Sequence, residues 1–280
     1  MKTVILAGGY GMRLREETTF RPKPMVEVGG EPLLWHILKI YGTFGIHDFL
    51  ICLGYKGEMI KEYFLNYDVR KSDICIDLGT RQREYLDVHH AEQDWRVALV
   101  DTGQSAMTGG RLLRIRHLVG QETFMMTYGD GVANINIAKL LECHQRAKRI
   151  ATVTAVRPLS RFGELKVKGS MVTEFNEKPQ VGSGWINGGF FVFEPELFRY
   201  LDGDDCILER SPLERLACEG QLAVYKHNGY WRCVDTQRDL EALNADWTSG
   251  NAPWKMWDIP SSTPVGHQRR RTKESLHVVE

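Results

Sequence analysis

The chain has 280 residues, of which 42% are hydrophobic and 26% are charged, a composition typical of a globular protein with a substantial core. Its 36 basic side chains (Lys and Arg) balance 36 acidic ones, which argues against a nucleic-acid partner and against an acidic disordered chain. The N-terminal apolar run is too short for a signal peptide and no later run approaches the roughly 18 apolar residues of a membrane span, so we expect a cytoplasmic protein without a membrane partner.

The first half of the chain alternates strand and helix patterns. A buried strand is predicted at residues 3–7, a helix begins at Pro32, and a second strand is predicted at residues 49–53. An amphipathic stretch around residues 60–64, a strand at 97–100, a helix from about residue 110 and a strand at 123–127 follow. Repeated strand-helix-strand units predict an α/β fold with a mostly parallel sheet and helices on both faces.

After about residue 150 the pattern changes to short β-rich segments. They lie at residues 152–156, 165–167, 172–175 and 189–193, and helices are predicted at 213–218 and 237–247. These segments could extend the sheet and form a lid over the strand ends. We therefore predict one domain over residues 1–258, with a core at about 1–150 and a β-rich portion at about 151–258, and a solvated tail at residues 259–280.

A glycine-rich turn follows the first strand directly. Its glycines are Gly8, Gly9 and Gly11. Glycine lets the backbone approach a ligand closely and directs successive N–H groups at an anion, as phosphate-binding loops do. The turn lacks the Gly-Lys-Ser/Thr of a P-loop and the spacing of GxGxxG, and a glycine turn between strand and helix is also a common structural feature.

Two cations lie shortly after this turn. Arg13 follows it closely, and Lys23 lies between Pro22 and Pro24, which predict a stiff, extended segment rather than a helix. A triphosphate requires cations beside a backbone anion site. The guanidinium of an arginine can bind two phosphate oxygens at once, and a rigidly held lysine supplies a point charge. The alternative is a pair of solvated surface cations.

Two aspartates end predicted strands. Asp130 lies in Tyr128-Gly129-Asp130-Gly131, and Asp235 follows a short strand about a hundred residues later. Ligands of open α/β sheets gather at such strand ends. Two carboxylates together with phosphate oxygens and waters suit Mg²⁺, which seldom uses an all-protein cage. Asp-Gly can equally be a plain turn, and the sequence does not bring the two aspartates together.

A third group of polar residues lies in the β-rich portion. Glu177 and Lys178 precede Pro179, and Asn187 precedes two glycines. Lys178 would neutralise a second phosphate, whereas Glu177 and Asn187 would hydrogen-bond hydroxyl groups. A salt bridge within a turn and an Asx turn are the structural alternatives.

Together and in this order, the motifs resemble the sugar-phosphate nucleotidyltransferases, from Met1 to about Asp258. The glycine turn, Arg13 and Lys23 mark the family as a whole, whereas Asp101-Thr102-Gly103 and Thr108-Gly109-Gly110-Arg111 look like its cytidylyltransferase branch. Other segments that carry the resemblance are Glu16-Glu17-Thr18, Trp35-His36, Gly54-Tyr55-Lys56-Gly57, Arg161-Phe162-Gly163, Glu177-Lys178-Pro179, Asn187-Gly188-Gly189, Asp235-Thr236 and Ala252-Pro253-Trp254-Lys255.

The resemblance implies a Rossmann-like nucleotide core, a sugar-binding portion and Mg²⁺ as cofactor. It implies transfer of CMP from CTP to a sugar 1-phosphate, glucose 1-phosphate in this branch, with release of pyrophosphate, and we expect a homo-oligomer. Carried over by residue, CTP would be held by Gly8, Gly9, Gly11 and the catalytic cations Arg13 and Lys23, the base by Thr102, Gly103 and Arg111, the sugar phosphate by Tyr128, Glu177, Lys178 and Asn187, and the metal by Asp130 and Asp235.

The chain departs from the family pattern at three positions. Met12 stands where a small hydroxyl residue is usual, and Arg157 and Glu164 stand where uncharged residues are expected. Arg157 and Glu164 lie near the expected acceptor side, so they bear on which phosphorylated acceptor is used, and an acceptor other than glucose 1-phosphate is the main alternative. A non-catalytic homologue would be expected to lack Lys23 or Asp130, and a glycosyltransferase would need an Asp-x-Asp motif that is not evident here.

Overall fold

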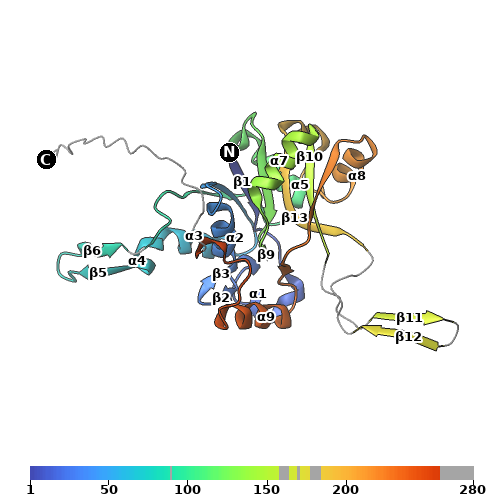
Figure 1. Cartoon of the computed structure of the whole chain (residues 1–280). Coiled ribbons are helices and arrows are strands. Elements are labelled where there is room, and N and C mark those ends of the chain that lie inside the picture. The colour runs from blue at the N-terminus through green and yellow to red at the C-terminus, as the bar shows by residue number, and fades with distance from the viewer. Residues whose placement is uncertain (89, 158–163, 169–170, 177–183, 259–280) are drawn as a thin grey trace.

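The computed structural model describes residues 1–88, 90–157, 164–168, 171–176 and 184–258. At its centre lies a seven-stranded sheet in the order β14-β10-β13-β8-β1-β4-β7 (Figure 1). The strands are β1 (Lys2–Leu6), β4 (Asp48–Leu53), β7 (Arg96–Asp101), β8 (Phe124–Tyr128), β10 (Ala151–Val156), β13 (Ile186–Phe193) and β14 (Leu222–His227).

The sheet is mixed but mostly parallel, as predicted. β1 pairs in parallel with β4 and with β8, β4 with β7, and β10 with β14. β13 runs antiparallel to both of its neighbours, β8 and β10. Strands from both sides of residue 150 therefore share one sheet.

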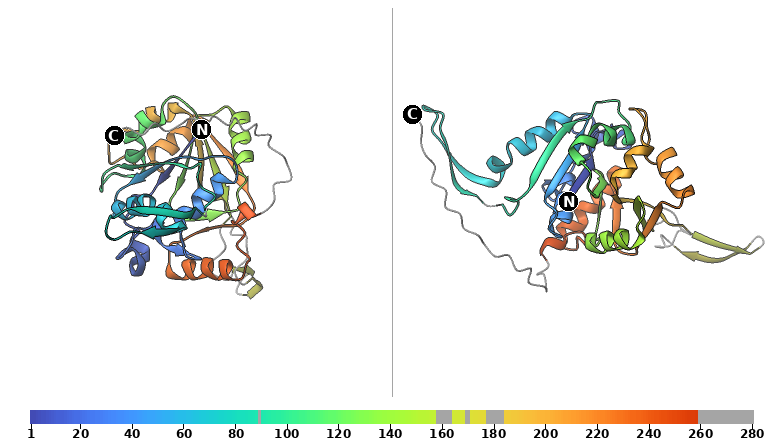
Figure 2. Two further views of the ribbon diagram at one scale, coloured as in Figure 1. Left: turned by 90° about the vertical axis from the view of Figure 1, so that its left-hand side faces the viewer. Right: turned by 90° about the horizontal axis from the view of Figure 1, so that it is seen from above.

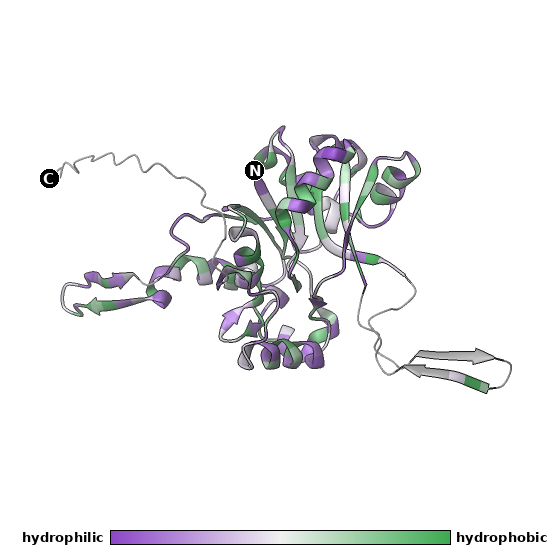
Figure 3. Cartoon of the chain, in the orientation of Figure 1, coloured by the Kyte–Doolittle hydropathy of each residue, from purple (hydrophilic) through white to green (hydrophobic). Residues whose placement is uncertain are grey.

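The central strands are buried on both faces, which explains their continuous apolar sequences. In β1, Val4 and Leu6 pack against one layer, whereas Ile5 and the following Ala7 pack against the other. Successive side chains of a strand point to opposite faces, so a strand covered on both sides reads as an unbroken apolar run. Hydrophobic residues accordingly concentrate along these strands in Figure 3.

Helices cover both faces of the sheet (Figures 1 and 2). The core on one face includes residues of α2 (Leu33–Gly42), α3 (Gly57–Leu65), α7 (Ile137–Ala147) and α9 (Gln237–Thr248). The core on the other face includes residues of α5 (Thr108–Arg114), α6 (Arg116–Val119) and α8 (Ser211–Cys218). The sequence predicted most of these helices but not α7. None of the helices in the part of the chain described is both long and apolar enough to cross a membrane.

Short elements complete the described structure. The short helices are η1 (Met12–Leu14), α1 (Arg15–Thr18), η2 (Lys23–Met25), α4 (Tyr67–Lys71), η3 (Pro195–Tyr200) and η4 (Met256–Asp258). The paired strands outside the main sheet are β2 (Glu27–Val28) with β3 (Glu31–Pro32), β9 (Gly131–Ala133) with β15 (Trp231–Cys233), β5 (Ser72–Ile76) with β6 (Arg83–Val88), and β11 (Glu164–Lys168) with β12 (Met171–Asn176). The predicted tail, residues 259–280, lies outside the described residues.

The hairpin β5–β6 stands away from the sheet in Figure 1, and the sequence pattern did not predict it. A strand that covers no core has no buried face to impose an alternation of apolar and polar residues. Four large apolar side chains are exposed on this hairpin, at Ile76, Leu78, Tyr85 and Leu86.

His36 of α2 is fully buried against the aromatic C-terminal segment. Its Nδ1 lies 3.3 Å from Nε1 of Trp254, which can only donate, so Nδ1 is the acceptor and Nε2 donates to the Val28 carbonyl at 2.8 Å. Burial lowers the pKa of His36 to about 4, although the bond to Val28 acts in the opposite direction. A neutral imidazole therefore joins α2 to Trp254, a residue more than two hundred positions later in the chain.

We expect His36 to make the protein less stable as the pH falls from about 6.5 to about 4, because the unfolded chain then binds a proton that the folded chain does not. A pKa difference of this size corresponds to on the order of 3 kcal/mol in the free energy of unfolding. Urea unfolding at a series of pH values should show a shallower acid dependence for His36→Gln than for the wild type. The exposed His117→Gln is the control, and an identical acid dependence in both variants would contradict the assignment.

Candidate functional site

A cleft of about 440 Å³ opens at the C-terminal ends of β1, β7 and β8. The chain proceeds from β1 to β4 on one side, whereas β8 lies on the other side of β1, and ligands of open α/β sheets bind where the strand order reverses in this way. The cleft is lined by residues 6–13, 23–24, 104–108, 111 and 128–130. It therefore contains the predicted residues Gly8, Gly9, Gly11, Arg13, Lys23, Arg111, Tyr128 and Asp130.

The glycine turn forms the floor of the cleft between β1 and η1. Gly11 has a φ of 62°, and a Cβ there would lie 2.7 Å from Cγ2 of Thr18, so a side chain is excluded by both conformation and space. Gly9 is different, because no atom lies within 4 Å of a Cβ placed on it. The departure from the family at Met12 is accommodated, since that side chain is 64% exposed.

Arg111 lies behind the glycine turn, and the residue is 5% exposed. It draws together the ends of β4 and β7, the turn after β1 and the start of the loop after β7. Nη1 donates to the carbonyls of Leu53 and Gly103 at 2.9 and 2.8 Å and to Oγ1 of Thr102 at 2.8 Å, and Nη2 lies 3.0 and 3.3 Å from the carbonyls of Gly8 and Gln104.

In this arrangement Arg111 and Thr102 are engaged with protein oxygens, and the contacts to a base that the sequence predicted for Arg111, Thr102 and Gly103 stay a prediction. The terminal nitrogens of Arg111 face protein oxygens, and the hydroxyl of fully buried Thr102 donates to the Leu53 carbonyl at 2.7 Å. The physical reason is that three chain segments end here with inward carbonyls, which need donors once they are removed from water. Arg111 borders the cleft, but its donors hold the wall together.

Lys23 joins the two predicted metal ligands. Its Nζ lies 2.8 Å from Oδ2 of Asp130 and 2.9 Å from Oδ1 of Asp235. The backbone at Lys23 begins the 3-10 turn η2 and is not the extended segment that the sequence predicted. Pro22 is extended, but Pro24 lies in the first turn of η2, where its fixed φ is compatible with helix and its missing N–H costs no hydrogen bond.

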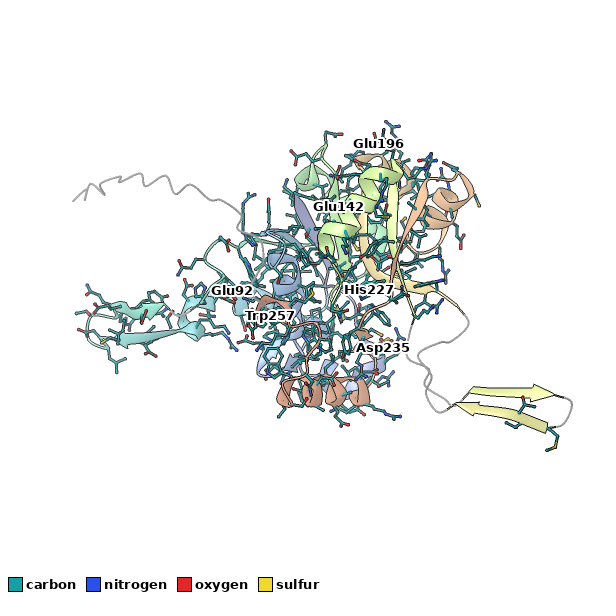
Figure 4. The ribbon with its side chains drawn as sticks, viewed as in Figure 1. Glu92, Glu142, Glu196, His227, Asp235 and Trp257 are labelled. Carbon is teal, nitrogen blue, oxygen red and sulfur yellow. The ribbon has the colours of Figure 1, made fainter. Side chains whose placement is uncertain are left out.

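Arg13 completes this group, which we call the ionic cluster: Arg13, Lys23, Asp130 and Asp235. Nη1 of Arg13 lies 2.8 Å from the other oxygen of Asp235, so the carboxylate of Asp235 contacts one cation with each oxygen. Asp235 follows β15 and is labelled in Figure 4. β15 pairs with β9, directly after Asp130, and this pairing brings the two aspartates together.

The members of the ionic cluster differ in exposure. The side chains of Lys23 and Asp235 are each 11% exposed, whereas that of Arg13 is 76% exposed. Burial alone would raise the pKa of Asp235, but the nearby Lys23 and Arg13 outweigh it and the pKa lies below its ordinary value. Burial would likewise lower the pKa of Lys23, but Asp130 and Asp235 raise it overall. Lys23 and Asp235 are therefore both charged at neutral pH.

Of the predicted acceptor residues, Tyr128 lines the cleft and Asn187 contacts Tyr128. Nδ2 of Asn187 lies 3.3 Å from the hydroxyl of Tyr128, and the Gly189 amide donates to Oδ1 of Asn187 at 2.8 Å. Asn187 therefore forms the Asx-type contact that was the structural alternative, and it also contacts Tyr128. Glu177 and Lys178 lie outside the described residues.

Sequence reasoning missed the loop at residues 104–107 and did not identify Glu209. The loop follows β7 directly and lines the cleft, so its position at a strand end was a usable signal. Glu209 contacts Tyr128 from a segment 81 residues further along the chain, and no local pattern marks such a contact.

Gly8 and Gly9 offer a matched test of the role of Arg111. A Cβ on Gly8 would lie 2.2 Å from Nη1 of Arg111, whereas a Cβ on Gly9 meets nothing. We expect Gly8→Ala to displace the guanidinium and leave buried carbonyls without a donor, at a cost of about 1–3 kcal/mol in the free energy of unfolding. Gly9→Ala should have the melting temperature of the wild type. Thermal unfolding measures the stability of the two variants, and amide exchange of residues 102–106 measures how well the backbone around Arg111 is held. Equal melting temperatures and equal exchange in the two variants would refute this role of Arg111.

Comparison with known proteins assigns the chain to a family. A family model described as "Nucleotidyl transferase" matches residues 2–250. The glucose-1-phosphate cytidylyltransferase of Salmonella typhimurium is 48% identical over 260 residues, which cover 92% of this chain and 100% of the relative. The mannose-1-phosphate guanylyltransferase catalytic subunit beta of Danio rerio is 28% identical, over 86% of this chain and 62% of its own. The crystal structure of HddC from Yersinia pseudotuberculosis, 20% identical, superposes with a TM-score of 0.65 over 88% of this chain and 99% of its own. The chain that forms this cleft is therefore a member of the nucleotidyl transferase family.

Proposed function

We propose that this protein transfers the CMP group of CTP to glucose 1-phosphate, with CDP-glucose and pyrophosphate as products. The observation that carries the proposal is the ionic cluster: four charged residues from distant segments meet at the cleft, in a chain 48% identical to a glucose-1-phosphate cytidylyltransferase. The guanylyltransferase relative is much less similar, at 28% identity. The base is therefore inferred from the relative that aligns along its whole length.

The reaction needs positioning and charge neutralisation more than proton transfer. An oxygen of the sugar phosphate, already anionic at neutral pH, attacks the α-phosphorus of CTP, and the bond from this phosphorus to the bridging oxygen of pyrophosphate breaks. No general base is required. Two anions must be held against each other, and the charge that develops must be met by preorganised cations. Lys23, held on two carboxylates, and Arg13 at the mouth of the cleft would supply these cations.

The ionic cluster also supports a requirement for Mg²⁺. Arg13 and Lys23 are balanced by Asp130 and Asp235, and the donors of Arg111 are occupied by protein oxygens, so the ionic cluster by itself offers no net positive charge to a triphosphate. The described residues contain no group of three or more Asp, Glu, His or Cys side chains that would cage a metal. Two hard carboxylates fit Mg²⁺, which binds through one or two carboxylates plus substrate phosphates. We propose that Asp130 and Asp235 hold this ion, which would neutralise phosphate charge.

The cleft divides into two sides in this proposal. The nucleotide side comprises Gly8, Gly9, Gly11 and the loop at residues 104–108, with Arg111, Thr102 and Gly103 as the wall that shapes it. Sequence similarity to a cytidylyltransferase supports the base assignment, with backbone groups of this loop in reach of the cleft. The acceptor side comprises Tyr128 and Asn187, and Glu177 and Lys178 stay proposed acceptor residues. Asn187 comes from the predicted β-rich portion, residues 151–258, whereas Tyr128 comes from the predicted core, residues 1–150.

The hairpin β5–β6 supports the expectation of a homo-oligomer. Its Leu78 and Leu86 are 87% and 63% exposed, and apolar side chains gathered on a projecting element mark contact surfaces. A second copy of the chain is the partner that we expect for this surface.

One observation favours an acceptor with an additional anionic group. At the same edge of the sheet as Asn187, the guanidinium of Arg157 lies 4.6 Å from the ring centroid of Trp185, and Nζ of Lys226 lies 5.5 Å from it. Two cations on one ring next to the acceptor side would attract a second phosphate. A sugar bisphosphate is therefore the second candidate acceptor.

The assay that tests the function combines the purified protein, Mg²⁺, one of CTP, UTP, dTTP, GTP or ATP, and one of several sugar phosphates. We expect kcat/KM, followed by pyrophosphate release and product mass, to be highest for CTP with glucose 1-phosphate. Equal use of UTP would overturn the cytidylyl assignment. Faster turnover of glucose 1,6-bisphosphate would favour the second candidate acceptor.

Lys23→Ala should lower kcat by roughly 10²-fold or more, because a cation that meets developing charge contributes several kcal/mol to the stability of the transition state. Steady-state kinetics measure the effect, with circular dichroism to show that the variant is folded. Lys61→Ala, an exposed lysine of α3 away from the cleft, is the control. Normal turnover in Lys23→Ala would remove this residue from the mechanism.

A further inference from the structure

The carboxylate of Glu209 lies between two segments of the cleft that are far apart in sequence. Its Oε1 accepts from the hydroxyl of Tyr128 at 2.5 Å, and its Oε2 accepts from the hydroxyl of Thr108 at 2.6 Å. Tyr128 ends β8 on the acceptor side, whereas Thr108 begins α5, the helix that carries Arg111. Both residues line the cleft, but Glu209 lies behind it.

The surrounding hydrogen bonds determine the direction of each contact. The hydroxyl of Thr108 accepts from the Leu208 amide at 2.9 Å, and that of Tyr128 accepts from Nδ2 of Asn187 at 3.3 Å. Each hydroxyl has one proton to donate, and each donates it in a hydrogen bond to an oxygen of Glu209. The two carboxyl oxygens of Glu209 can each accept one of these hydrogen bonds, so the two contacts are compatible.

The chain of contacts ends at an amide group on the acceptor side. Oδ1 of Asn187 accepts from the Gly189 amide at 2.8 Å, so Nδ2 of the same side chain faces Tyr128. Gly189 has a φ of 80°, and a Cβ there would lie 2.7 Å from the ring of Tyr128, so the ring is held from that side as well.

We propose that Glu209 is a positioning residue for the acceptor: it orients the hydroxyl of Tyr128 and, through it, the amide of Asn187, and through Thr108 it ties this acceptor wall to α5. The inference rests on the proposed function in one respect, which is that Asn187 lies where the sugar phosphate binds. Glu209 itself touches neither substrate.

Kinetics separate this role from a general loss of stability. With CTP saturating, Glu209→Ala and Tyr128→Phe should each raise the KM for glucose 1-phosphate by about tenfold, with a smaller change in the KM for CTP. The double variant should be no worse than the more impaired single variant, because both changes break the same link. Glu209→Gln keeps one acceptor and should lie between wild type and Glu209→Ala. Glu214→Gln, an exposed position on α8, is the matched control.

A second measurement needs no substrate. Amide exchange of residues 186–189 in the free protein should be faster in Glu209→Ala and Tyr128→Phe than in wild type, whereas Glu214→Gln should match wild type. If the wild type fails to use CTP with glucose 1-phosphate, the proposed function is wrong. The exchange data would still test whether Glu209 positions Asn187 through Tyr128. Unchanged exchange at these residues, or equal rises in both KM values, would overturn the role of Glu209.

Discussion

The cleft depends on one buried guanidinium. Parallel strands that end at the same edge of a sheet leave carbonyl groups pointing into the protein, where water cannot reach them, and an unpaired buried carbonyl is costly. Arg111 satisfies carbonyls from the turn after β1 and from the ends of β4 and β7, so three segments keep a common arrangement. The absence of a side chain at Gly8 follows from this, because the guanidinium occupies the space that a Cβ would need.

The ionic cluster adds chemistry to that framework at little electrostatic cost. Buried charges persist in a protein when they are paired, and Lys23 is paired with two carboxylates while Asp235 is paired with two cations. The cluster is close to neutral as a whole, so the site can remain folded without a ligand. The same balance explains why a bound polyphosphate would call for a divalent cation in addition to these side chains.

The single antiparallel strand of the described sheet places the acceptor side next to the nucleotide side. β13 runs against β8, with Phe190 opposite Thr127, so the beginning of β13 lies beside the end of β8. Asn187 consequently contacts Tyr128 at the edge of the sheet where the parallel strands end and the loops that line the cleft begin. A parallel β13 would have carried Asn187 to the opposite edge. The reversal of one strand therefore brings Asn187 to the edge of the sheet at which the cleft lies.

The sequence by itself determined most of the local elements and the residue types at the cleft, although it did not predict α7 or the hairpin β5–β6. Apolar runs such as residues 49–53 marked buried strands, and the glycine turn, Lys23 and Asp130 were identified from their positions at strand ends and beside prolines. Tertiary structure alone decided the partners: that Lys23 bridges Asp130 and Asp235, that Arg111 faces carbonyls, and that Glu209 accepts a hydrogen bond from the hydroxyl of Tyr128. Local patterns record conformational preference and burial, which act over a few residues. A hydrogen bond between positions 81 or 107 residues apart depends on how the strands are ordered, and that order is settled by the packing of the whole sheet.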